Sequence, residues 1–537
     1  MLTTDFHPFP FVPGLRRLFL DYCSSAAAAR PFYASLPVDK DWQTRPSVPA
    51  HRQQLARLVA GQNSEPSPAA AAALDALRGG AGVVVTGQQV GLFGGPLFTP
   101  FKAATAVARA RQATAAGHPH IAIFWLATED HDFAEINHVV FPARRALRTL
   151  TYAQAPAEPR PVGGIVLDET ILPLIDQARE LLGDSDATEA LAAAWQPGHT
   201  FAQAFRQFYA TAFAAQGLLV LDAEGRELHR MGAPVLAAAL ERADELHQAL
   251  VERNQILENS GYHAQVAVLP GASLLFLVEE HTGARLALRR QAATAQEPGG
   301  LWKAGRQSYS TADLLGILAS EPERISPSAL LRPVFQDFLL STSALVGGPA
   351  EVAYYAQSAV LYERILSRVT PALARFSATL IEPAIGKLLH RHELTLEQVF
   401  SASAASLAQL LAARSIPAEG KEKIAAAGAA LEAELTPLVG WMQSLDAGLG
   451  HSAETSASKM RYQMGRLRRL AANFQLQREA SLGRDAGALS QALYPGGALQ
   501  ERLHGAAYYF ARYGFELAEE ITAQAANPSP GHTALWM

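Results

Sequence analysis

The first 381 residues alternate between short apolar runs and longer stretches that favour helix. The short runs are rich in β-branched and aromatic residues, and several end beside glycine or acidic residues. Parallel neighbouring strands need a long connection to return to the same edge of a sheet, so this alternation favours a parallel sheet with crossover helices. The pattern predicts an α/β fold with a Rossmann-like core over 1–381. Its expected strands are Gly82–Thr86, Ile121–Ala127, Gly217–Asp222, Leu339–Val346 and Ala378–Ile381.

One segment of the core departs from this alternation. Residues 265–290 contain three short apolar runs separated by Pro-Gly and Thr-Gly turns. Strands that follow one another so closely pair in an antiparallel way. We expect a small antiparallel insertion here that caps a pocket.

From about Glu382 onward the pattern becomes helical. Apolar residues recur at spacings of three, four and seven in two stretches, Lys421–Leu445 and Thr455–Glu479. Such spacing is typical of an antiparallel helical hairpin or coiled coil. We therefore predict a C-terminal helical coiled-coil domain over 382–537, with a long arm that mediates homodimerisation.

Composition and charge exclude several classes of protein. The 537 residues are 49% hydrophobic, which suffices for a large core, and 45 basic against 50 acidic residues leave a net charge of -5. This balance provides no overall basic field, so nucleic acid is not expected as a partner. No apolar run reaches the ~20 residues of a membrane span, so we expect no membrane contact either.

Cysteine content and the N-terminal segment indicate the compartment. Cys23 is the only cysteine, which excludes a disulfide framework within the chain and a zinc site made of several thiolates. The first 22 residues lack the basic region and the uninterrupted apolar run of a secretion signal. A cytoplasmic location follows as the expectation.

A glycine-rich turn follows the strand expected at Gly82–Thr86. Glycines let the backbone approach a ligand closely, and the unsatisfied N–H groups that open a helix suit phosphate. The turn matches neither GxGxxG nor the P-loop, so a purely structural turn is the alternative. The tandem amides that follow favour ligand binding, and a lysine just inside the next helix can pair with phosphate. The candidate residues are Gly87, Gln88, Gln89, Gly94, Gly95 and Lys102.

An acidic cluster with one histidine follows the strand expected at Ile121–Ala127. It consists of Glu129, Asp130, His131 and Asp132. Ligands of open α/β sheets bind outside the carboxyl ends of the strands, so we expect this cluster to share one pocket with Gln88 and Gln89. Carboxylates around a histidine favour its protonated form, which predicts a raised pKa for His131.

The same segment has donors for a metal ion, with His138 as a second histidine. The spacing of the two histidines does not match the known zinc motifs. We therefore predict no metal site in the protein, although a metal-dependent hydrolase that uses residues 129–135 stays open as an alternative.

Further candidates come from three later segments. A Gly-Gly-Pro turn opens a helix on which a carboxylate and tyrosine hydroxyls share one side, and a half-buried amphipathic helix is the alternative. An arginine with two hydroxyls nearby precedes the last expected strand, and an Arg follows a second Gly-Gly turn near the C-terminus. The candidate binding residues in these segments are Arg332, Glu351, Tyr354, Arg375, Ser377, Tyr494 and Arg502.

Four motifs together resemble the family of bacillithiol biosynthesis cysteine-adding enzymes, BshC. In order along the chain, they are TGQQVGLFGGPLFTPFKA, FWLATEDHDFAEINH, LRPVFQDFLLSTSALVGGPAEVAYYAQ and LYPGGALQER. The resemblance covers nearly the whole length. It implies a core similar to class I aminoacyl-tRNA synthetases, connecting insertions, a dimerising coiled coil, and a ligase that adds cysteine to glucosaminyl-malate.

Joining an amine to a carboxylate requires an activated carboxylate, normally through ATP, and a deprotonated amine. We therefore expect ATP or ADP at the turn Gly87–Gly95, supported by Lys102 and Arg375, and Mg²⁺ can accompany the nucleotide. Asp130 and Asp132 are expected to hold the incoming ammonium, with His131 as the general base. Gln88 is expected to contact the reacting groups.

A function of another class also fits the pattern. A nucleotide-regulated binding or scaffold protein would use the helical arm as its working surface, where a basic face between Lys459 and Arg469 could contact RNA. The acidic net charge weighs against this alternative.

Overall fold

The computed structural model describes residues 3–44, 48–143, 146–291 and 300–537. They form two compact units. The first comprises Met1–Thr379 with Glu501–Ala534, and the second comprises Leu380–Gln500 with Leu535–Met537. The division after Thr379 lies close to the predicted boundary at 381/382, and residues 501–534 fold with the first unit.

The first unit is built on a five-stranded parallel sheet. In spatial order, its strands are β13 (Ala372–Ala374), β12 (Thr342–Gly347), β2 (Gly82–Gln88), β3 (His120–Leu126) and β6 (Leu219–Asp222). Every neighbouring pair in it is parallel. The prediction of a Rossmann-like parallel core is confirmed.

Two strands at the edge differ from the prediction. β13 was not expected, because a three-residue strand is too short to give a period. The expected closing strand, β14 (Ser377–Ile381), instead belongs to a separate sheet in the order β1-β15-β14, with β1 at Thr3–Pro8 and β15 at Gly531–Trp536. Only two residues separate β13 from β14, too few for the crossover that parallel neighbours need.

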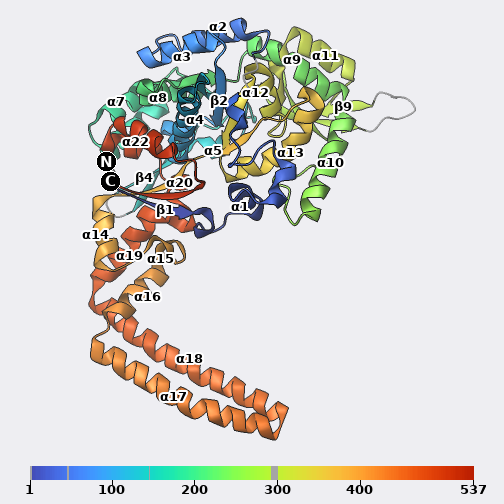
Figure 1. The fold of residues 1–537 in the computed structure, drawn as a ribbon. Helices are drawn as coiled ribbons and strands as arrows, with labels where there is room; N and C mark the ends of the chain where they lie inside the picture. Colours follow the sequence, from blue (N-terminus) through green and yellow to red (C-terminus); the bar gives the residue numbers. More distant parts are fainter. Residues whose placement is uncertain (1–2, 45–47, 144–145, 292–299) are drawn as a thin grey trace. The chain divides into compact units, whose positions relative to one another are not determined.

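The core of the first unit lies on both faces of this sheet, where helices pack (Figure 1). All seven residues of β3 are buried. Side chains of β2 and β3 that point to one face, such as Val83, Ile123 and Trp125, join one hydrophobic cluster with Phe335 of α12 (Arg332–Leu340). The α4 helix (Phe98–Ala115) links β2 to β3, and its many buried alanines allow close packing.

The inserted segment forms a second, antiparallel sheet of five strands. Its order is β10 (Gln307–Tyr309), β9 (Leu301–Ala304), β8 (Arg285–Gln291), β7 (Ala272–Val278) and β11 (Ile325–Pro327). The predicted range 265–290 therefore holds two strands and part of a larger sheet. Its first apolar run is no strand, because the backbone of Val266 pairs with the side chain of Gln357.

The second unit contains the predicted helical hairpin. The α17 helix (Ala418–Leu445) and the α18 helix (Ala447–Arg478) meet at Asp446, whose side chain accepts the N–H of Leu449 at 2.9 Å and so begins α18. The two helices run side by side in opposite directions (Figure 1). Arg461 and Glu432 bridge them at 2.7 Å. No helix among the described residues is long and apolar enough to cross a membrane.

Candidate active site

A cavity of about 410 Å³ opens at the carboxyl ends of β2, β3 and β12. Parallel pairing sets Gly87 beside Trp125 and Gln88 beside Leu126, so the residues that follow these two strands leave the sheet together. Many of the predicted site residues line the cavity. They are Gly87, Gln88, Gln89, Lys102, Glu129, Asp130, His131, Arg332, Glu351, Tyr354, Arg375 and Arg502.

The tandem glutamines contact the acidic cluster, as predicted. The Nε2 of Gln89 donates to Asp130 Oδ2 and to Glu135 Oε2, both at 2.7 Å. The Nε2 of Gln88 donates to the Oε1 of Gln89 at 3.3 Å. The amide of Gln89 therefore holds two carboxylates at one point of the cavity.

Lys102 is a buried connection between two motifs. Its Nζ lies 2.5 Å from Glu351 Oε2 and donates to the carbonyl of Gly87 and to Oε1 of Gln88, both at 2.8 Å. Burial lowers the pKa of Lys102. The lysine therefore joins the turn after β2 to the start of α13 (Pro349–Leu366), where Glu351 also accepts the N–H of Gly348 at 2.9 Å.

The cavity is also lined by positively charged arginines, which include Arg332, Arg375 and Arg502. Arg332 donates to Gln336 Oε1 at 2.7 Å and to the hydroxyl of Tyr354 at 3.1 Å, so its direct partners are uncharged. Arg502 of α20 (Gln500–Leu503) is exposed at the rim. Arg375 differs, because its guanidinium lies 2.6 Å from the buried Glu501 and is neutralised there.

The strand order separates these charges. Arg375 follows β13 at the sheet edge, whereas Glu129 and Asp130 follow β3, and two strands lie between them. Glu129 is itself paired with the buried His229 of α9 (Arg226–Glu241) at 2.8 Å. Burial lowers the pKa of His229, but Glu129 outweighs it and the net pKa is raised. Apart from Arg285 of β8, which lies beside the acidic residues, the cavity is bipolar, with Arg375 after β13, Arg332 on the helix before β12, and carboxylates after β3.

His131 behaves differently from the prediction. Its Nδ1 lies 3.0 Å from a guanidinium nitrogen of Arg285 on β8. Burial and the charge of Arg285 lower the pKa of His131 and outweigh Asp130 and Asp132. The expected raised pKa is wrong, because burial has the largest effect and Arg285 adds to it from a strand 154 residues away in the sequence.

Arg285 was missed as a site residue. It is 7% exposed and lines the cavity beside His131. The only local signal was its place at the start of a strand directly after the Thr-Gly turn, which carries no chemistry by itself.

Five predicted residues do not line the cavity. Asp132 caps α5 (Phe133–Ile136) by accepting the N–H of Glu135. Ser377 bonds to Glu501 and His532 inside the core. The others are two turn glycines with positive φ and a tyrosine of the second unit that packs on Phe400, namely Gly94, Gly95 and Tyr494.

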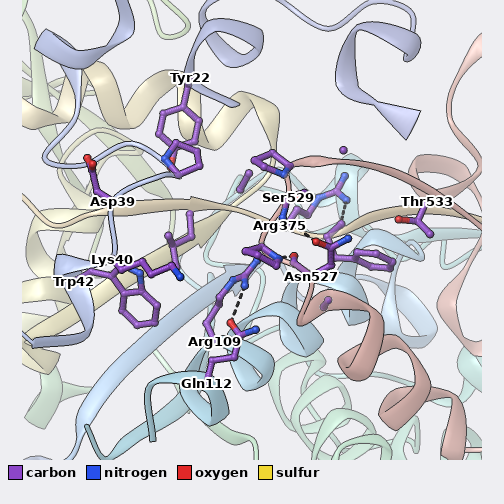
Figure 2. A pocket seen from close by; sticks show the side chains of 18 of the residues that line it. Tyr22, Asp39, Lys40, Trp42, Arg109, Gln112, Arg375, Asn527, Ser529 and Thr533 are labelled. Carbon is purple, nitrogen blue, oxygen red and sulfur yellow. Dashed lines mark hydrogen bonds between the residues drawn. The ribbon is translucent and has the colours of Figure 1, made fainter. Parts of the chain in front are cut away.

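A second cavity, of about 80 Å³, is shown in Figure 2 and is several times smaller. Arg109 is one of its lining residues and donates to Gln112 Oε1 at 2.8 Å and to the carbonyl of Asn527 at 3.1 Å. Tyr22 and Trp42 line another part of it. These contacts hold the segment around Asn527 against α4, so the geometry here is that of a packing contact.

The described residues contain no group of three or more His, Cys, Asp or Glu side chains arranged to hold a metal ion. The cavity is lined by charged groups, amides and hydroxyls of the chain. Such groups bind and orient ligands that carry charges of both signs.

Comparison with known proteins identifies the family. Residues 9–376 match the family described as bacillithiol biosynthesis BshC, N-terminal Rossmann-like domain, and residues 378–537 match its C-terminal coiled-coil domain. A relative from Koribacter versatilis named "Putative cysteine ligase BshC" is 41% identical over 99% of both chains. A relative of the same name from Solibacter usitatus is 34% identical over 97% of this chain and 92% of its own. From its sequence and its two domains, the chain belongs to the BshC family of bacillithiol biosynthesis.

Proposed function

We propose that this chain is a cytoplasmic ligase that joins cysteine to glucosaminyl-malate through an amide bond and consumes ATP to activate the carboxylate. The observation that carries the proposal is the bipolar cavity at the carboxyl ends of the parallel strands. Its relatives carry the name of a cysteine ligase, which supports the same chemistry.

The arginine side of the cavity suits the anionic reactants. Arg332 keeps its full charge because its hydrogen-bond partners are uncharged, and Arg502 stands at the rim. A guanidinium binds phosphate or carboxylate oxygens through two parallel hydrogen bonds. We assign the nucleotide phosphates and the carboxylate groups of the substrates to this side.

The acidic side suits the amine. Asp130 and Glu135 are held together by Gln89, and an ammonium group between them neutralises their repulsion. Amide formation then requires the amine to lose its proton and its nitrogen to attack the activated acyl carbon. The acyl carbon forms a bond to nitrogen as its bond to the phosphate-bearing oxygen breaks. The separation of the two charge groups orients amine and acyl group toward each other.

The test is the dependence of ATP turnover on both substrates. ATP should be consumed, and the amide product detected by mass spectrometry, only when cysteine and glucosaminyl-malate are both present. Asp130→Asn should weaken use of the amine, whereas Asp184→Asn, an exposed site far from the cavity in sequence, serves as the matched control. ATP hydrolysis without either substrate, or amide formation without a nucleotide, would contradict the proposal.

We also propose that the hairpin α17–α18 forms a homodimer with a second copy of the chain. Three large apolar residues of α17 lie at spacings of three and four and stay exposed, namely Leu438 at 47%, Trp441 at 57% and Leu445 at 58%. α18 repeats the pattern with Leu467, Leu470 and Phe474. The hairpin alone leaves both stripes in water, and an exposed apolar stripe of this size marks an interface.

Light scattering on the full chain tests this surface. Replacing Leu438, Trp441 and Leu445 together by asparagine should raise the dimer dissociation constant by about 100-fold or more, because buried aromatic and aliphatic anchors dominate such interfaces. Replacing the exposed Glu434 and Lys459 by glutamine on the same hairpin should leave the dimer intact. A wild-type monomer, or an undisturbed dimer of the asparagine variant, would reject the surface.

A further inference from the structure

We infer that Arg285 holds His131 as a neutral imidazole with its proton on Nε2, so that His131 donates a hydrogen bond to an oxygen of the bound acyl group. His131 is then a donor in this site, and Arg285 is its positioning residue. The identity of the oxygen rests on the proposed ligase function, whereas the protonation state of His131 does not.

The contact itself determines which nitrogen carries the proton. Arg285 Nη1 lies 3.0 Å from His131 Nδ1 with hydrogen-bond geometry. A guanidinium stays charged in proteins and has only donors. Nδ1 must therefore accept, and the proton of the neutral ring lies on Nε2.

Arg285 cannot easily turn away from this contact. Its Nε donates to Ser326 Oγ and its Nη2 to the carbonyl of Pro327, each at 3.0 Å. The guanidinium also lies 3.8 Å above the ring of Phe276. Because Arg285 is only 7% exposed, any rotation would leave buried donors without partners. The bonds of Nε and Nη2 therefore hold Nη1 in place against His131 Nδ1.

The charges around His131 oppose one another, and burial with Arg285 outweighs the two carboxylates, which raise the pKa of His131. Arg285 faces it from β8, while Asp130 and Asp132 belong to its own loop. Burial and Arg285 together lower the pKa of His131, so the ring stays neutral at neutral pH. Asp130 Oδ1 lies 3.7 Å from Nδ1 but already accepts the backbone N–H of His131 at 2.7 Å.

The remaining ring nitrogen is available to a ligand. His131 lines the cavity, and its Nε2 has no hydrogen-bond partner within the described ranges of the chain. An Nε2–H group cannot remove a proton from the amine. It can stabilise negative charge that develops on the acyl oxygen when the amine attacks. Removal of the amine proton then falls to a carboxylate of the cavity or to water.

The protonation state can be measured without any turnover. The full chain labelled with ¹⁵N-histidine should show, at pH 7, a His131 ring with a protonated Nε2 and a bare Nδ1. The signal is assigned by its loss in His131→Gln. Arg285→Met should mix the two tautomers and raise the pKa of His131, Arg285→Lys should restore part of the wild-type pattern, and the exposed Arg289→Met of the same strand should change nothing. A wild-type imidazolium, or a proton on Nδ1, would overturn the inference.

Turnover provides a second, separate readout. The amide nitrogen of glutamine reaches the place of Nε2, whereas that of asparagine overlies Nδ1. We therefore expect His131→Gln to keep the rate within about tenfold of wild type and His131→Asn to lose about 10²-fold or more. Equal inactivity of both variants would indicate a base and reject the donor role. If the chain shows no ligase activity at all, the proposed function fails while the tautomer measurement still decides the role of Arg285.

Discussion

Lys102→Met is expected to lower the turnover of the proposed ligase by about 10²- to 10³-fold. Lys102 is 4% exposed and joins three groups of the cavity, namely Glu351, the carbonyl of Gly87 and the amide of Gln88. Methionine keeps the length of the side chain but removes all three contacts. The turn after β2 and the start of α13 then lose their common anchor, and the reactants lose alignment.

The fold should also lose stability in this variant, because the largely buried carboxylate of Glu351 is left without its cation. Removing one partner of a buried pair costs about 3–5 kcal/mol in free energy of unfolding. Adding Glu351→Leu removes the unpaired charge and should recover much of that stability, but not the turnover. Lys303→Met, at an exposed lysine of β9, is the matched control. Wild-type turnover in a folded Lys102→Met protein would show that the lysine only supports packing.

Glu501→Gln is expected to lower the free energy of unfolding by about 3–5 kcal/mol. Glu501 is 1% exposed and Arg375 is 5% exposed, and they lie 2.6 Å apart. Glu501 also accepts the hydroxyl of Ser377 at 3.0 Å and the N–H of Ala378 at 3.1 Å. Arg375 and these hydrogen bonds hold the pKa of Glu501 below its usual value despite burial, which raises it. The neutral amide of glutamine leaves the Arg375 guanidinium buried and uncompensated.

Chemical denaturation of the two proteins measures this loss. The double variant Arg375→Met with Glu501→Leu replaces both charges by apolar side chains and should regain most of the stability, since only an unpaired charge is costly in the core. Glu520→Gln, at an exposed carboxylate of α22 (Glu516–Ala525), should leave the unfolding midpoint unchanged. If Glu501→Gln unfolds at the wild-type midpoint, the pair does not hold this part of the core.

Local periodicity accounts for the elements that were predicted correctly. The apolar runs before Gly87 and before Ala127 are long enough to show a buried strand, and the spacing of three, four and seven in 421–479 is specific to helices. β13 has only three residues, below the length at which a period exists. The sheet to which β14 belongs was decided by the short connection from β13. The residues of a strand do not by themselves specify the strand with which it pairs.

The convergence of the two main motifs was also predictable. Residues that follow neighbouring parallel strands leave the sheet at the same edge, so Gln89 and Asp130 were expected together and lie 2.7 Å apart. For Gly94 the local pattern was ambiguous. Its φ is +88°, and the Cβ of any larger residue at this position would lie 2.8 Å from the Phe208 ring. Backbone conformation and packing therefore explain the glycine.

By itself, the sequence of this protein determined the parallel core, the helical hairpin, and which residues gather at the strand ends, because periodicity and strand-end chemistry are local properties. The tertiary structure alone decided the partners of the charged groups. Arg285 reaches His131 across 154 residues and Glu501 reaches Arg375 across 126. Since a partner at that separation leaves no local pattern, the direction of the His131 pKa and the burial of Arg375 could be known only from the folded chain.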